Sequence, residues 1–534
     1  MKKGMALFAV TGMIVLAIAC SNKERLSQEP VADNPKVNMS GMPIVDEPIK
    51  LQIFAGKSPT TANNWNDVML WNEYKKMTNI EVEWIQVPFD SLSERRNIVL
   101  AGGDYPDAFH TALFSNADIV RYGTEGIFIR LNDLIDQYAP NLKAILDQYP
   151  ELRKALTMPD GNIYSFPTFV DPEFQSSLAG SKMWINKKWL DAAGIEEPQT
   201  TDDFYNMLKA FKDGDFNQNG LPDEIPYGGV KVSGLINYLK GAWGLGNRGN
   251  SHPYVDIDPD TKELRFIPIS LQYKEVLEFV HKLYKEELIQ KDIFSVNSSA
   301  FYAKGSEGLY GSLITTSPVT LMNQQDYIGA SALKGPAGDQ LYAFVTSPST
   351  RLGSFVITDK NEHPEATVRW IDHFYGEEGR RMFFFGFENV TYTAMDDGTY
   401  TYTKEITDNP KGLTFEQALA QYLTWPGGGY PGFITAKYFQ GAEGRPEALE
   451  ATEKLAPYFP EEIWSSFNYT LDEYDQLASL GADLGSYVEE MQSKFVSGQA
   501  SFAEWDEYVS TLNKIGLEKY MKIYKDAFDR YQQN

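Results

Sequence analysis

Short stretches of alternating hydrophobic and polar residues predict strands along this chain, and segments with helical spacing separate them. Residues 49–55 and 80–84 read as two such strands. Between them, apolar residues recur at helical intervals from Val68 to Met77. A second helix is expected to end at Gly102-Gly103, and a third strand is expected over 105–109. Strands that alternate with helices in this way predict a βαβαβ unit, and hence a largely parallel sheet.

Strand-like alternation and helical spacing of apolar residues continue along the chain to the C-terminus. Further strands are expected over 163–167, 183–186 and 353–357. Further helices are expected over 131–138, 142–156, 187–193 with Gly194 as its stop, 202–211 with Thr201 as its cap, 363–375, and through most of the last part of the chain. The mature chain is therefore expected to be an α/β protein.

The N-terminus has the pattern of an export signal. Lys2 and Lys3 precede an apolar run over 5–19, and the only cysteine, Cys20, follows it at once. The run before Cys20 resembles a bacterial lipobox, which predicts a signal peptide over 1–19 and a lipidated cysteine. Residues 20–48 are polar and contain proline without periodicity, as expected of a flexible tether. The alternative is an ordinary signal peptide with an incidental cysteine.

Composition narrows the function classes. The chain has 534 residues, which is more than one hydrophobic core usually supports, so two domains are expected. Its 48 basic and 73 acidic residues give a net charge of −25, which disfavours nucleic-acid binding. A single cysteine excludes disulfides and thiolate metal clusters. Aromatic residues make up 13% of the chain, enough for a stacking surface beyond the core.

An oxygen-rich loop predicts a calcium site. Side-chain oxygens fall at alternate positions and then at two adjacent ones, with Gly220 beside them for a tight turn. Calcium takes six to eight oxygen ligands, and alternation lets a curling loop direct every second side chain inward. The predicted ligands of a structural Ca²⁺ are Asp215, Asn217, Asn219, the Leu221 carbonyl, Asp223 and Glu224. Pro226 takes the place of the bidentate glutamate of an EF-hand, and a solvated turn is the alternative.

No enzyme motif is present in the sequence. It lacks a Gly-x-Ser-x-Gly elbow, a Walker loop, a His-Glu-x-x-His pair and a Rossmann glycine pattern. Its 5 histidines show no metal-ligand spacing. We therefore expect no catalytic residues and no enzymatic activity.

Several motifs, in order, resemble family 1 extracellular solute-binding proteins, the receptors of bacterial carbohydrate ABC importers. They are Ala101-Gly102-Gly103-Asp104-Tyr105-Pro106-Asp107, Asn162-Ile163-Tyr164-Ser165-Phe166-Pro167, residues 184–190, Gly194 with 198–204, and 353–358 followed by 363–366. The branch is similar to alginate-oligosaccharide receptors, which carry a run like 215–224 as a structural calcium site. The resemblance implies a type II periplasmic-binding-protein fold, in which two α/β lobes joined by a hinge hold the ligand between them.

The resemblance also places lobes, ligand residues and partners. One lobe would comprise 49–166 and 354–430, and the other 170–346 and 431–534. Residues expected near the cleft are Ser58, Asn63, Asn64, Trp65, His110, Tyr164, Phe166, Trp243, Asn247, Arg351, Phe385, Glu388, Trp425 and Tyr430. For each aromatic residue in this set, core packing is the alternative to sugar stacking.

The implied function is a lipid-anchored receptor on the extracellular face of the cytoplasmic membrane. It would act as a monomer that binds an oligosaccharide and delivers it to ABC permease subunits. Two other functions stay open, a surface sugar sensor or adhesin without transport, and a secreted polysaccharide-active enzyme. Neighbouring permease genes would favour import, whereas a neighbouring histidine kinase would favour sensing.

Overall fold

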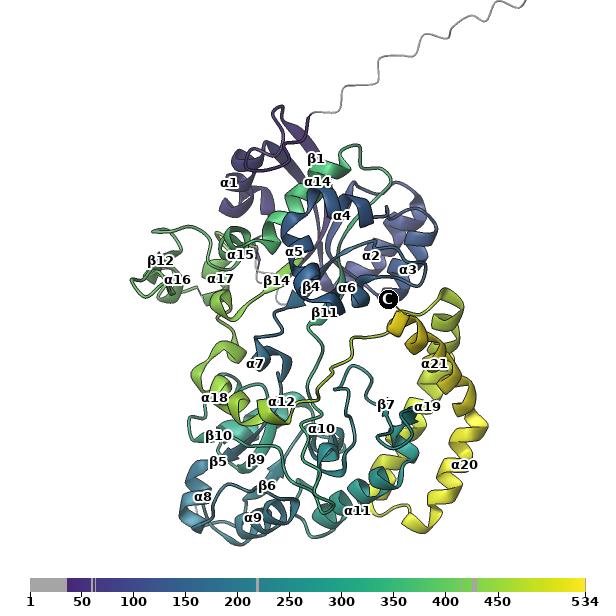
Figure 1. The fold of residues 1–534 in the computed structure, drawn as a ribbon. Coiled ribbons are helices and arrows are strands. Elements are labelled where there is room, and N and C mark those ends of the chain that lie inside the picture. The colour runs from purple at the N-terminus through teal and green to yellow at the C-terminus, as the bar shows by residue number, and fades with distance from the viewer. Residues whose placement is uncertain are drawn as a thin grey trace, which may run out of the picture.

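Two lobes lie one above the other, each built around its own β-sheet (Figure 1). The structure is a computed structural model of the chain, and it describes residues 36–58, 61–62, 64–217, 220–413, 415–424 and 430–533. Cys20, Asn63, Asn219 and Trp425 lie outside these residues. The architecture confirms the expected α/β fold with two lobes of the periplasmic-binding-protein type.

The first lobe contains a mixed sheet. In the described part of the chain it has six strands in the order β14-β4-β11-β3-β1-β2. Strand β1 pairs in parallel with both β2 and β3, which confirms the predicted βαβαβ unit. Strand β11 runs antiparallel to both β3 and β4, so the sheet is less parallel than the sequence pattern predicts. The strands are β1 (Ile49–Lys57), β2 (Ile80–Pro88), β3 (Ala108–Phe114), β4 (Phe166–Val170), β11 (Ser349–Ile357) and β14 (Gly432–Ile434).

Proline divides one helix that the pattern predicts as continuous over 142–156. Helix α5 ends before Tyr149, and Pro150 begins α6. Proline lacks an N–H and clashes with the preceding turn, but it is tolerated in the first turn of a helix. The helices of this lobe are α1 (Met69–Thr78), α2 (Phe89–Gly102), α3 (Asn116–Thr124), α4 (Asn132–Tyr138), α5 (Pro140–Gln148), α6 (Pro150–Leu156), α14 (Pro364–Asp372), α15 (Glu377–Phe384), α16 (Lys404–Thr407) and α17 (Phe415–Leu419).

The second lobe contains a smaller sheet in the order β10-β5-β9-β6. Helix α9 begins at Thr201, and its N-cap is Thr200, not Thr201 as expected, because Thr200 and Asp203 form a capping box. Gly194 ends α8 with φ 67°, as predicted. The strands and hairpin are β5 (Lys182–Asn186), β6 (Ile225–Gly228), β7 (Val255–Ile257), β8 (Leu264–Phe266), β9 (Tyr310–Thr315) and β10 (Tyr327–Gly329). The helices are α7 (Gln175–Leu178), α8 (Lys187–Ala193), α9 (Thr201–Asp213), α10 (Val232–Leu239), α11 (Leu271–Lys285), α12 (Ser298–Ser306), α13 (Pro318–Met322) and α18 (Pro446–Leu455).

Long helices at the C-terminus flank the second lobe and reach up to the first, where the C-terminus lies (Figure 1). They are α19 (Leu471–Ser497), α20 (Trp505–Ile515) and α21 (Leu517–Gln533), and they confirm the helical pattern expected there. Within the described residues, none of the helices is long and apolar enough to cross a bilayer. Short 3-10 turns occur at η1 (Trp65–Asp67), η2 (Lys240–Trp243), η3 (Ile267–Ile269), η4 (His373–Tyr375), η5 (Ala436–Tyr438), η6 (Ala442–Gly444), η7 (Ala456–Tyr458) and η8 (Phe502–Glu504).

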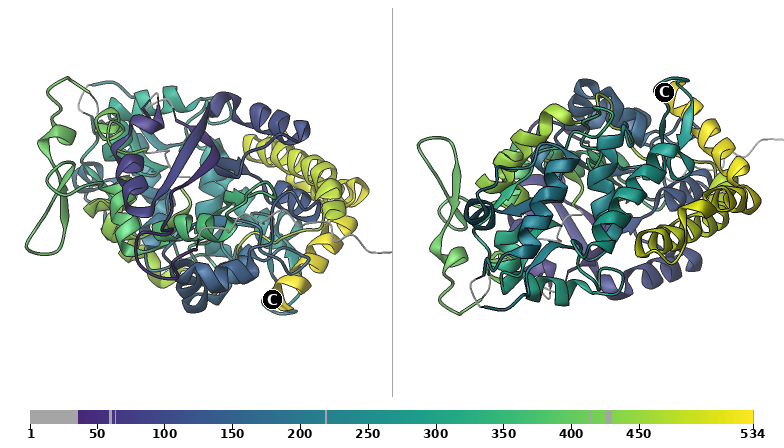
Figure 2. Two further views of the ribbon diagram at one scale, coloured as in Figure 1. Left: turned by 90° about the horizontal axis from the view of Figure 1, so that it is seen from above. Right: turned by 90° about the horizontal axis from the view of Figure 1, so that it is seen from below.

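Strand pairing sets lobe boundaries that differ by a few residues from those expected. Strand β14 pairs with β4, so the first sheet continues to Ile434, beyond the expected boundary at 430. Strand β11 begins at Ser349, before the expected start at 354, and β4 continues to Val170. A hairpin of β12 (Tyr392–Ala394) and β13 (Tyr400–Tyr402) projects from the side of the first lobe (Figure 2).

Candidate functional site

A cavity of about 310 Å³ lies where β3 ends and β11 begins, against the segment that leads into α19. Small-molecule sites commonly have volumes from about 300 Å³ upward. The cavity is lined by Leu113, Phe114, Ser115, Asn116, Ala155, Ser349, Thr350, Arg351, Leu352, Gly353, Ser465 and Ser466. Its lining joins the first sheet to the chain that returns from the second lobe.

Hydroxyl, amide and guanidinium groups provide most of the polar lining. Asn116 Nδ2 donates to Asn468 Oδ1 at 3.1 Å. Asn468 Nδ2 in turn donates to the carbonyls of Ala155 at 2.7 Å and Thr157 at 2.9 Å. These bonds fix the segment before α19 to the first lobe. Groups that donate and accept hydrogen bonds suit a ligand rich in hydroxyls.

Serine hydroxyls meet where two chain segments cross beside the cavity. Ser465 Oγ lies 2.7 Å from Ser347 Oγ and donates to Ser349 Oγ at 3.3 Å. His252 Nε2 lies 3.1 Å from the Ser465 carbonyl, which can only accept, so Nε2 carries the hydrogen. Burial lowers the pKa of His252 to about 4, and its ring is therefore neutral at pH 7.

The end of β3 is bent at the cavity wall. Thr111 and Leu113 have φ 49° and 55°, values that non-glycine residues rarely adopt. The pairing with β11 shifts register here: Gly353 pairs with Phe114, whereas Phe355 pairs with His110. A Cβ on Gly353 would lie 2.6 Å from the Phe114 carbonyl, so the close approach requires glycine. Sparsely populated backbone conformations of this kind cluster at binding sites.

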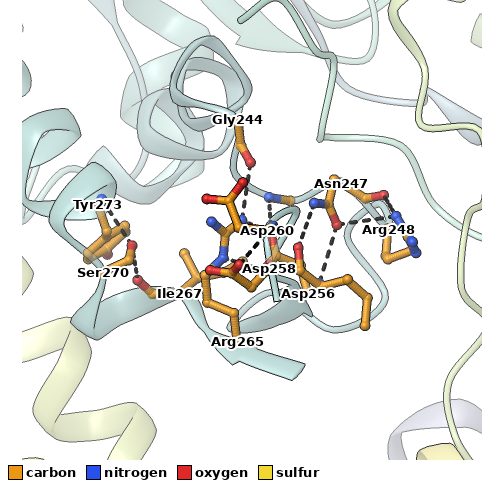
Figure 3. A network of polar contacts seen from close by, with 12 residues as sticks. Gly244, Asn247, Arg248, Asp256, Asp258, Asp260, Arg265, Ile267, Ser270 and Tyr273 are labelled. Atoms are coloured by element: carbon orange, nitrogen blue, oxygen red, sulfur yellow. Dashed lines mark hydrogen bonds and ion pairs between the residues drawn. The ribbon is translucent and has the colours of Figure 1, made fainter. Parts of the chain in front are cut away.

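A buried ion pair shapes the loop that carries Asn247 (Figure 3). The Arg265 guanidinium donates to both carboxylate oxygens of Asp256, at 2.8 and 2.7 Å. Asp256 Oδ2 also accepts from the Gly246 N–H at 2.8 Å. Asn247 Nδ2 donates to the Ile257 carbonyl at 2.7 Å. Asn247 therefore ties the loop to the β7–β8 hairpin, and its amide is engaged within the lobe.

Most of the aromatic residues expected near the cleft are packed in the protein interior. Trp65 lies among Trp71, Trp84 and His110, and burial lowers the pKa of His110 to about 3. The other interior side chains of the set are Tyr164, Phe166, Trp243, Phe385 and Tyr430. This placement favours the packing role that the sequence left open beside sugar stacking.

The remaining candidates are spread apart. Arg351 lines the cavity, and it is the one residue of the expected ligand set that does so among the described residues. Asn64 caps η1 and donates to Asp67, and Glu388 is exposed beside the β12–β13 hairpin. Ser58 lies at the end of β1 and is half-buried.

Sequence reasoning missed residues that line the cavity, including Asn116 and Ser465, and it missed Asn468, which accepts a hydrogen bond from Asn116. One signal for Asn116 is present in the sequence. Ser115 and Asp118 have the spacing of a capping box, and they form that box at the start of α3, directly after β3. No comparable local signal marks Ser465 or Asn468.

The oxygen-rich loop after α9 has a turn that fits a cation. Gly220, sixth when Asp215 is first, has φ 75° and donates to Asp215 Oδ2 at 3.1 Å. Glu224 Oε1 accepts from the Phe216 N–H at 2.8 Å, while its Oε2 is buried without a hydrogen-bond partner. Within the described residues, no three carboxylate, imidazole or thiolate side chains form a metal-binding group. Amide and carbonyl oxygens would complete the donor set.

A family model described as bacterial extracellular solute-binding protein matches residues 59–381. The chain belongs to this family. That membership places the protein among extracellular binding proteins, and it confirms the expectation that the chain is not an enzyme.

Individual relatives of this solute-binding protein extend over nearly the whole chain. The fructooligosaccharide ABC transporter substrate-binding protein FusA of Streptococcus pneumoniae serotype 4 is 29% identical over 98% of this chain and 97% of its own. A solved structure of the S. pneumoniae FusA EF-hand mutant with fructo-nystose covers 91% of this chain and 100% of its own, with 27% identity and a TM-score of 0.70. A solved structure described as an HMO-binding, ABC-transporter-associated solute-binding protein of Bifidobacterium longum infantis covers 91% of this chain and 99% of its own, with 22% identity and a TM-score of 0.76. At 22% identity, the similarity to the Bifidobacterium protein shows only that the two chains share a fold.

Proposed function

We propose that this solute-binding protein is a receptor that binds an oligosaccharide outside the cell and delivers it to an ABC permease. The observation that carries the proposal is the end-to-end match to a fructooligosaccharide-binding transporter protein. The cavity beside β3 and β11 supports it, because its wall is rich in hydroxyl groups and also contains the Asn116 amide and the Arg351 guanidinium.

The geometry suits ligand capture between the lobes. Asn116 and Ser115 come from the first lobe, whereas Ser465 and Ser466 come from the segment returning from the second. A sugar bound there would contact both sides of the hinge and favour one relative position of the lobes. A ligand shifts a conformational equilibrium only by its differential affinity for the two states, so such two-sided contacts are what lobe closure requires.

Thermal unfolding with and without sugars tests the proposal. The mature protein is screened against an oligosaccharide panel that includes nystose and maltotetraose, and binding is then measured by calorimetry. A ligand at a hundred times its Kd stabilises by about 2.7 kcal/mol. Asn116→Ala should weaken binding, whereas Asn66→Ala, at an exposed asparagine outside the cavity, should not. A panel in which no oligosaccharide raises the unfolding temperature would overturn the proposal.

We further propose that the loop over 215–224 holds a structural calcium ion. Asp215, Asn217, Asn219, Asp223 and Glu224 would provide side-chain oxygens, and Leu221 its carbonyl. The Asp215–Gly220 turn and the unpartnered Glu224 oxygen support this assignment, and one relative was solved as an EF-hand mutant. Bound calcium would neutralise three carboxylates in a short loop and brace α9 against β6.

A lipid anchor at Cys20 is proposed from the sequence alone. The residues around Cys20 lie outside the described part of the chain, and a relative in Bacillus subtilis is named lipoprotein LipO. A diacylglycerol anchor would hold the receptor at the outer face of the cytoplasmic membrane, where it would work as a monomer beside its permease.

A further inference from the structure

One buried arginine holds the bent end of β3. Arg96 comes from α2, and only 6% of its surface is exposed. Its Nη1 donates to the carbonyls of Ala112 and Leu113, both at 2.8 Å. Those carbonyls belong to the stretch where the backbone of β3 adopts left-handed conformations. The guanidinium thus provides hydrogen bonds that the irregular ladder with β11 does not supply.

The same guanidinium reaches the start of α3. Arg96 Nη2 lies 3.4 Å from Asp118 Oδ2, and the guanidinium carbon lies 4.6 Å from the centre of the Phe114 ring. Asp118 Oδ2 also accepts from the Ser115 N–H at 3.0 Å and from Ser115 Oγ at 2.9 Å. Arg96 therefore joins the carbonyls before the corner to the carboxylate after it.

The corner held in this way is a wall of the interlobe cavity. Leu113, Phe114, Ser115 and Asn116 line the cavity consecutively, whereas Arg96 does not line it. Preorganised binding groups raise affinity because less ordering is needed when the ligand binds. A planar guanidinium can hold two carbonyls, a carboxylate and an aromatic face together, which a lysine ammonium on a flexible chain cannot reproduce.

We propose that Arg96 is a positioning residue for ligand binding, which fixes the β3–α3 corner so that Ser115 and Asn116 face the ligand. The inference rests on the proposed function, since it assigns the ligand to this cavity. It predicts that Arg96 acts on affinity through Asn116 and not only through overall stability.

The test compares Arg96→Lys and Arg96→Leu with Arg95→Leu, which removes an exposed arginine one residue earlier on α2. Each variant is checked for folding by circular dichroism, and Kd and dissociation rate are measured with the best oligosaccharide of the panel. Arg96→Lys should stay folded and bind at least tenfold more weakly through faster dissociation. Arg95→Leu should bind like the wild type. Unchanged Kd in folded Arg96→Lys would overturn the inference.

A double-variant cycle separates positioning from general destabilisation. If Arg96 acts through the corner, Arg96→Lys should weaken binding much less in an Asn116→Ala background than in the wild type. If the fold-change in Kd of the double variant equals the product of the two single fold-changes, Arg96 acts independently of Asn116, and the proposal is overturned. Failure of the wild type to bind any sugar would reject the proposed function itself, so the two failures are distinguishable.

Discussion

Replacing Asp256 with alanine would leave the Arg265 guanidinium buried without its counter-ion. Asp256 is fully buried, and the side chain of Arg265 is 10% exposed. Removing one member of a buried pair costs about 3–5 kcal/mol, because the remaining charge stays desolvated. The variant also loses the bond from the Gly246 N–H, which shapes the loop around Asn247 (Figure 3).

A loss of unfolding free energy of this size is measurable as a fall in the melting temperature. At about 2–4 °C per kcal/mol for a lobe-sized domain, Asp256→Ala should lower the unfolding temperature of the second lobe by roughly 6–20 °C. Differential scanning calorimetry in neutral buffer measures this change. The double variant Asp256→Leu with Arg265→Met replaces the ion pair with apolar groups, and it should recover most of the loss.

The double variant is also the control for the physical argument. If the cost comes from an unpaired buried charge, the double variant should be more stable than Asp256→Ala. Equal melting temperatures for the wild type and Asp256→Ala would refute the reasoning. A double variant less stable than Asp256→Ala would show that the lost stability comes from the missing ion-pair interactions and not from an unpaired buried charge.

The remaining predictions concern the metal, the anchor and pH. Chelation of calcium should lower the unfolding temperature, and Asp215→Ala should mimic that loss without rescue by added calcium; elemental analysis that finds no calcium would contradict the site. Cys20→Ser should move the protein from the membrane fraction to the medium with sugar affinity unchanged, and a variant that still sediments with membranes would reject the anchor. Burial lowers the pKa of His110 to about 3 and of His252 to about 4, so the unfolded chain binds protons first as pH falls below about 6.5. Below that pH, each of these two histidines should lower the free energy of unfolding by up to about 1.4 kcal/mol per pH unit. Burial raises the pKa of Asp372 to about 6, so the folded chain binds this proton first. Asp372 therefore adds to the free energy of unfolding as the pH falls from about 6 to about 3.8. The net result is a fall in stability from pH 6.5 to 4 in calorimetric scans, and His252→Gln should flatten it.

Local periodicity was enough to determine many elements of this fold. The alternation over 49–55 and 80–84 and the helical spacing between them produced β1, α1 and β2 as expected. Gly194 ends its helix because only a left-handed residue satisfies that turn, which is a local requirement. Where two local signals competed, as at Tyr149-Pro150, the steric restriction of proline prevailed over helical periodicity.

The candidate site depended on contacts that local patterns do not encode. Trp65, Phe166 and Tyr430 are as suitable for sugar stacking as for packing by residue type, and only the fold places them in the interior. Asn116 and Asn468 are far apart in the sequence, and their meeting depends on the path of the chain between the lobes.

The sequence by itself predicted the α/β class, which the structure confirms, because periodicity is a property of neighbouring residues. The export signal and the metal site of the oxygen-rich loop stay predictions from local hydropathy and ligand spacing. Tertiary structure alone decided which side chains face the interlobe cavity. It brought Arg96 of α2 against the carbonyls of β3 and Ser465 against Ser349, because burial and hydrogen bonding between distant segments arise only when the chain packs.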